Sequence, residues 1–229
     1  MEKLKETTKG VLLYGKALIK WICLSVLVGI LGGAVGSVFH MCIDFVTETR
    51  TENGWLLYLL PLGGAAIAVL YKLCRKCGKM DTDRVLEAVA TEEKVPFLMA
   101  PLIFISTVIT HFLGGSAGRE GAALQLGGSI GYKVGRMCRL NRGDMHMIVI
   151  SGMSAVFAAL FGTPLTAAVF AIEVVSVGAL YYSALVPSIL AGLTGYWMAH
   201  LFGLHPVHFE GIPVPDFSPE MLAKIVIFS

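Results

Sequence analysis

Long apolar stretches separated by short charged ones dominate the pattern of this chain. Three of them, Lys16–His40, Trp55–Tyr71 and Val95–Ala117, reach the length of roughly 20 residues that a helix needs to cross a bilayer. The pattern therefore predicts membrane-spanning helices in the first half of the sequence.

The second half of the sequence is apolar too, but its pattern is interrupted. Residues Gly121–Val134 are amphipathic and too short to cross comfortably, Met147–Val175 is broken at Phe161-Gly-Thr-Pro164, and Leu180–Phe202 could cross if tilted. Such interruptions place helix ends, with their unpaired backbone groups, within the membrane where they meet ions instead of lipid. The expected fold class is all-α, a polytopic membrane protein with tilted and broken helices.

Small residues recur at helical spacing in two of these stretches. Gly29, Gly32, Gly33 and Gly36 lie in the first stretch, and Gly127, Gly131 and Gly135 lie in the short amphipathic one. This spacing is typical of membrane helices whose backbones approach closely.

Composition agrees with the membrane interpretation and excludes several functions. The chain is 55% hydrophobic and 15% charged, with a mean hydropathy of +0.74, which argues against a soluble binding module. A net charge of +2 argues against nucleic acid as a partner.

Cys74 and Cys77 form a lone CxxC without a second ligand pair, so no metal and no cofactor is predicted. The apolar stretches contain no Ser/His, HExxH or paired-aspartate constellation, so we expect no enzyme.

Lysine and arginine predict the topology. Basic residues gather before the first span, around Lys72–Lys79 and around Lys133–Arg142, whereas the Asp44–Asn53 and Leu204–Glu220 loops are acidic or neutral. Because basic loops favour the cytoplasm, we expect residues 1–15 to form a cytoplasmic N-terminal segment and the two other loops to face outward. The expected location is the plasma membrane, with several crossings.

The segment Gly114–Gly131 places two charges, Arg119 and Glu120, among glycines in an otherwise apolar region. Charges at membrane depth are costly and indicate function. If a helix begins at Gly121, its N-terminus is an anion site with a carboxylate beside it. Ionised, Glu120 could occupy that site as an internal anion; protonated or displaced, it could leave the site to a permeating one.

Two motifs carry a family resemblance. Gly118-Arg-Glu-Gly121 with the following Gln125-x-Gly-Gly128, and the stretch from Ala158 to Glu173, resemble the CLC family of chloride channels and chloride/proton antiporters. The similarity runs from roughly Cys23 to Phe202 and corresponds to the first half of a family member. It implies tilted, often incomplete helices in the first of two inverted repeats, a homodimer, and one anion pathway per subunit.

The resemblance also implies roles for single residues. Glu120 corresponds to the gating glutamate, which blocks the outer site and carries protons, and Gly118, Arg119 and Gly121 match the rest of that motif. Arg119 would be mainly structural. The backbone amides of Gly121, Ala122 and Ala123 would cradle the anion.

Three departures from the family pattern bear on the transported ion. Ala122 replaces a proline, Val174 stands where the internal proton glutamate is expected, and Met80, in Gly78–Thr82, falls near the inner anion-binding serine. Together they resemble the fluoride-exporting branch, so fluoride/proton antiport is favoured over chloride transport. Met80 has an alternative reading as an adaptable packing residue.

The predicted partners are halide anions (fluoride or chloride), protons and the lipid bilayer. Proton-coupled antiport leads, a passive anion channel is the second interpretation, and a non-transporting assembly subunit is the third. The sequence stops inside the apolar run Ile225–Ser229, so we expect residues 16–229 to be the truncated first half of a membrane domain.

Overall fold

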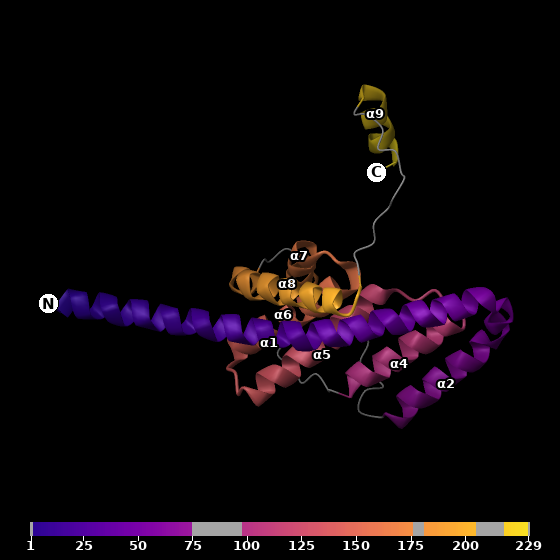
Figure 1. Ribbon diagram of the computed structural model, residues 1–229, viewed down its shortest axis with the longest axis horizontal. Coiled ribbons are helices and arrows are strands. Elements are labelled where there is room, and N and C mark those ends of the chain that lie inside the picture. The colour runs from indigo at the N-terminus through magenta and orange to yellow at the C-terminus, as the bar shows by residue number, and fades with distance from the viewer. Residues whose placement is uncertain (1, 75–97, 176–180, 205–217, 229) are drawn as a thin grey trace.

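The computed structural model describes residues 2–74, 98–175, 181–204 and 218–228, and within these ranges every regular element is a helix (Figure 1). In chain order they are α1 (Glu2–Glu52), the 3₁₀ turn η1 (Gly54–Leu59), α2 (Leu60–Leu73), α4 (Met99–Phe112), α5 (Arg119–Met137), α6 (Arg142–Phe161), α7 (Pro164–Val175), the 3₁₀ turn η2 (Tyr182–Ala184), α8 (Leu185–Leu201) and α9 (Pro219–Phe228). The predicted all-α fold is confirmed for this part of the chain.

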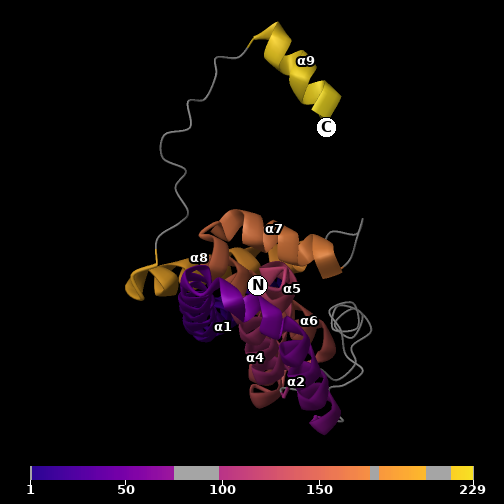
Figure 2. The ribbon, with the colours of Figure 1, turned by 90° about the vertical axis from the view of Figure 1, so that its right-hand side faces the viewer.

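The long helix α1 runs across the bundle formed by α5, α6 and α8 (Figures 1 and 2). Lys20 pairs with Asp144 near the start of α6, and His40 contacts the carbonyl of Leu160 near its end. Because both contacts advance together along the two helices, α1 and α6 run parallel. The same helix therefore connects the two ends of the bundle.

The glycines predicted to bring helices together do so. A Cβ atom on Gly127 would lie 2.3 Å from the carbonyl oxygen of Gly152, and one on Gly33 would lie 2.8 Å from the Cα of Gly195. These distances leave no space for a side chain, so α5 lies directly on α6, and α1 on α8. The interpretation of both glycine patterns as close backbone contacts is confirmed.

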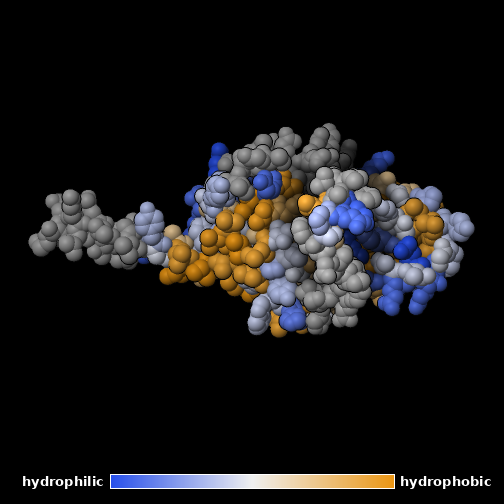
Figure 3. Space-filling model, turned by 90° about the horizontal axis from the view of Figure 1, so that it is seen from above, coloured by the Kyte–Doolittle hydropathy of each residue, from blue (hydrophilic) through white to orange (hydrophobic). Residues whose placement is uncertain are grey.

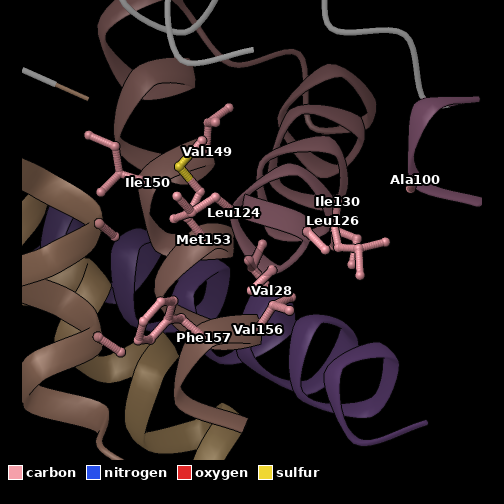
Figure 4. Packing of buried hydrophobic residues seen from close by; sticks show 14 of the residues in the cluster. Val28, Ala100, Leu124, Leu126, Ile130, Val149, Ile150, Met153, Val156 and Phe157 are labelled. Carbon is pink, nitrogen blue, oxygen red and sulfur yellow. The ribbon is translucent and has the colours of Figure 1, made fainter. Parts of the chain in front are cut away.

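Apolar side chains fill the space that the glycines leave between these helices. Met153 of α6 packs beside Leu124 of α5, while Val156 lies next to Val28 of α1 (Figure 4). Leu126 and Ile130 point from the other side of α5 toward α4 (Figure 4). The middle of α5 is thereby enclosed on several sides.

The helical structure is interrupted between α6 and α7, as the sequence predicts. Gly162 adopts the left-handed conformation, with φ at +69°, and its amide donates to the carbonyl of Ala158. Pro164 is the first residue of α7, where its fixed φ suits a helix start and its missing N–H costs nothing.

Two expected boundaries are wrong. Residues Asp44–Asn53 do not form a loop, because α1 continues to Glu52. Phe39, Ile43 and Val46 are buried at helical spacing there, and packing extends the helix past the charged residues. In the described part of the expected span Val95–Ala117, residues 98–117, the helix is the shorter α4, which ends at Phe112. The predicted border between residues 15 and 16 lies within α1 and is not marked by a break.

The apolar surface of the helices is suited to contact with the hydrocarbon core of a membrane. Four helical stretches in the described residues are long and apolar enough to cross a membrane: Tyr14–Glu52, Gly54–Leu73, Arg142–Phe161 and Tyr182–Leu201. Large apolar side chains such as Leu18, Tyr58 and Trp197 are exposed. Figure 3 shows a broad hydrophobic area on the face seen from above.

Candidate functional site

A glycine turn brings the chain to the start of α5. After α4, Gly114 takes a φ of +83°, its amide donates to His111, and the amide of Gly115 donates to Thr110 at 2.8 Å. These two bonds form a Schellman motif, which satisfies the last carbonyls of α4. The chain then extends to Gly118, whose φ of −69° and ψ of 141° are those of an N-cap residue.

Helix α5 begins at Arg119, two residues before the expected start at Gly121. The difference arises because Gly118 supplies the extended N-cap conformation. An α-helix leaves the amides of its cap and first three residues outside its own hydrogen-bond ladder, here those of Gly118 to Gly121. Ala122 and Ala123 follow in the ladder and are buried. The positive end of the helix dipole therefore lies at the Gly-Arg-Glu-Gly motif.

The Glu120 side chain folds back over Gly118. Its Oε2 atom lies 2.7 Å from the position that a Cβ on Gly118 would occupy, so only glycine leaves room for this conformer. Glu120 is exposed, and among the described residues it forms no ion pair. A carboxylate at the exposed, positive end of a helix can move between that end and solvent without breaking a salt bridge.

Arg119 is held by the end of α1. Its Nη1 atom lies 3.6 Å from Oδ1 of Asp44, while Oδ2 of Asp44 lies 2.9 Å from Nε2 of His40. The other ring nitrogen of His40, Nδ1, lies 3.1 Å from the carbonyl oxygen of Leu160. Side chains from α1 and α5 and a carbonyl from α6 therefore form one polar chain beside Glu120.

Sequence reasoning missed His40 and Asp44, because it divided them between the end of a span and a loop. The signal was available in their spacing. Two residues four positions apart lie on the same face of a helix, so a continuous α1 predicts that they meet. Only the extension of the helix, which depends on tertiary packing, makes that inference possible.

Of the remaining predicted residues, Met80 and the whole stretch Gly78–Thr82 lie outside the described residues. Val174 is half-buried in α7. In the described ranges, no group of three His, Cys, Asp or Glu side chains is arranged to hold a metal ion.

Comparisons with known proteins place these features in context. The sequence model of a family described as "Voltage gated chloride channel" matches residues 63–229. A "Chloride/fluoride channel protein" of Pseudomonas syringae pv. tomato is 34% identical over 203 residues, which cover 87% of this chain and 45% of the relative. An "H(+)/Cl(-) exchange transporter ClcA" of Vibrio vulnificus is 30% identical over 186 residues, covering 74% of this chain and 39% of the relative.

Two solved structures resemble the fold. A CLC-type fluoride/proton antiporter matches with a TM-score of 0.83 and 31% identity over 92% of this chain and 53% of that one. A slow cyanobacterial Cl⁻/H⁺ antiporter matches with a TM-score of 0.69 and 16% identity over 90% and 52%, which supports the fold alone. The chain spans about half the length of the proteins that it matches.

Proposed function

The chain belongs to the voltage-gated chloride channel family, and from this premise we propose that it serves the exchange of halide ions for protons across a membrane, with Glu120 as the gate. The observation that carries the proposal is the position of the Glu120 carboxylate. It is exposed, forms no ion pair within the described residues, and lies at a helix start with unpaired amides. Exchange of an anion for protons is also what the names of the Vibrio relative and of the fluoride/proton antiporter of known structure state for those proteins.

The gate works by competition between two anions. The amides of Gly118 to Gly121 and the helix dipole favour a negative charge at the start of α5. Ionised Glu120 supplies that charge itself and excludes a halide. When Glu120 takes up a proton, its neutral carboxyl group is no longer attracted to the amides and the helix dipole. The group then leaves the site, and a halide can bind there. Each cycle thereby links a proton to an anion. Ala122 and Ala123, which line the next turn, would contribute to the walls of the site.

We further propose that fluoride is preferred over chloride. Met80 and Val174 support this choice. By the family resemblance, Met80 falls near the inner anion-binding serine of chloride transporters, and Val174 stands where their internal proton glutamate is expected. Two similar proteins, the Pseudomonas relative and the antiporter of known structure, carry fluoride in their names. The unit of function would be a homodimer in the plasma membrane, with residues 1–15 on the cytoplasmic side.

Substitution of Met80 tests the preference. In proteoliposomes of the transport-competent protein that contains this sequence, fluoride efflux should exceed chloride efflux, as followed with ion-selective electrodes. Met80→Ser should reduce the ratio of the two rates roughly tenfold, the effect of about 1.4 kcal/mol at a binding site. Equal fluxes before substitution would assign the protein to chloride transport.

Exchange is distinguished from passive conduction in the same vesicles. An outward fluoride gradient should drive protons inward against their own gradient, because each anion leaves in exchange for a proton. Anion efflux without proton uptake would favour the alternative, a passive anion channel on the same fold.

A further inference from the structure

The polar chain beside Glu120 assigns a role to residues that the gating motif does not include. Asp44 offers one carboxylate oxygen to Arg119 at 3.6 Å and the other to His40 at 2.9 Å. The first distance is that of an ion pair, and the second is that of a close histidine–carboxylate contact, which is an ion pair when the imidazole is protonated. Asp44 therefore bridges the arginine next to the gate and a histidine on its own helix.

His40 is well placed to fix the direction of Asp44. Its side chain is only 16% exposed, and its Nδ1 faces the Leu160 carbonyl, which can only accept a hydrogen bond. Because Asp44 Oδ2 is an acceptor too, the ring donates to both partners only when both of its nitrogens carry a proton. The contact with Leu160 orients the imidazole ring, and the ring in turn presents Nε2 to the carboxylate. The Asp44 side chain, which is 53% exposed, thus gains a defined position through a buried neighbour.

The charge of Arg119 matters because of where it lies. The Arg119 side chain is 31% exposed and belongs to the first residue of α5, at the positive end of the helix dipole. Without a counter-charge, the cation would add to that positive potential and hold any anion there more tightly. A site that binds too tightly releases slowly, and transport requires release.

We propose that Asp44, oriented by His40, is a positioning residue that holds Arg119 and offsets its charge, so that the anion site beside Glu120 binds weakly enough to turn over. The inference rests on the proposed function of Glu120, because it concerns the affinity of the same site. Asp44 thereby lowers the positive potential that the Arg119 charge adds at the anion site, where a halide or the Glu120 carboxylate binds.

Asp44→Asn removes the counter-charge and keeps the shape. Fluoride efflux, measured against internal fluoride concentration in proteoliposomes of the transport-competent protein, should show a KM lower by roughly three- to tenfold and a lower maximum rate. Both change together because the anion is held longer. A folding defect alone lowers the maximum rate through fewer active molecules and leaves KM unchanged.

Second substitutions show whether Asp44 acts through Arg119. In an Arg119→Gln background, Asp44→Asn should change KM less than about twofold, because an exposed carboxylate without its partner is screened by water and salt. Asp44→Glu should restore most of the original KM. Glu48→Gln is the matched control, since Glu48 lies one turn further along α1, is exposed, and forms no ion pair among the described residues; it should leave both constants unchanged.

The outcomes separate this inference from the proposed function. If Glu120→Gln abolishes proton coupling while Asp44→Asn leaves KM unchanged or raises it, only the role of Asp44 is wrong. An equal KM shift with and without Arg119 also overturns it. Should Asp44→Asn fail to fold, His40→Gln decides: a lower KM supports the inference and an unchanged KM refutes it. If Glu120→Gln leaves proton coupling intact, the proposed gate itself is wrong.

Discussion

The beginning and the middle of α5 differ in exposure and in packing. At its beginning, Glu120 is exposed and lies over a glycine that leaves room for its side chain. In the middle, Leu126 and its neighbours are buried, and Gly127 and Gly131 approach the α6 backbone so closely that neither could carry a side chain. The contrast teaches that one helix can serve as a closely packed platform at its centre and carry an exposed charged group at its end.

The largest effect should come from breaking the platform. In Gly127→Leu the new side chain must enter a space where even a Cβ would lie 2.3 Å from a carbonyl oxygen of Gly152. Because backbone on both sides must shift, we expect destabilisation of about 3 kcal/mol or more. Thermal unfolding in detergent, followed by size-exclusion chromatography, measures this loss.

The matched control is Gly64→Ala on α2, where a Cβ would meet nothing within 4 Å. Alanine favours a helix over glycine, so this variant should be as stable as the parent or more stable by about 1 kcal/mol. Equal stability of the two variants would contradict the idea that α5 rests directly on α6.

A smaller and different effect should follow at the beginning of α5. Gly118→Ala places a Cβ 2.7 Å from the present position of Glu120 Oε2, so the carboxylate must rotate away. A rotamer change of this size corresponds to roughly a three- to tenfold change in the gating equilibrium, and anion flux should rise accordingly. Stability should fall by no more than about 1 kcal/mol, the cost of alanine at an N-cap. Lost stability with unchanged flux would mean that Gly118 serves the fold and not the gate.

The smallest effect should appear at the opposite end of the bundle. Lys20 and Asp144 form an ion pair there, and the Asn141 side chain accepts a hydrogen bond from the Asp144 amide at 2.8 Å. Because the lysine is 43% exposed, Lys20→Ala should cost less than about 1 kcal/mol and leave anion flux unchanged. A flux change as large as that of Gly118→Ala would show that the two ends are coupled.

The all-α class and the break between α6 and α7 were predictable from the sequence because they depend on local patterns. The Phe161-Gly-Thr-Pro164 interruption specifies a left-handed residue followed by a proline start, and the structure has both. Glycine spacing likewise predicted where backbones meet. These features need no knowledge of distant residues.

The length of α1, the contact between α1 and α5 and the start of α5 could not be predicted, because they depend on tertiary contacts and backbone conformation. Residues 41–52 contain four charges, which favoured a loop, but burial of Ile43 and Val46 keeps them helical. That extension is what brings Asp44 to Arg119, a residue from another helix. The start of α5 at Arg119 likewise depends on the conformation of Gly118, which sequence alone leaves open. The roles of Glu120, its neighbours and Met80 stay predictions.

Simultaneous recording of anion and proton movement for Glu120→Gln tests the central claim most directly. Glutamine keeps the shape of the side chain and cannot titrate, so proton uptake during fluoride efflux from proteoliposomes should disappear, while anion flux either stops or becomes a passive leak. Unchanged stability in detergent would confirm that the platform is intact. Proton coupling and anion rate equal to those of the parent would show that the gate lies elsewhere.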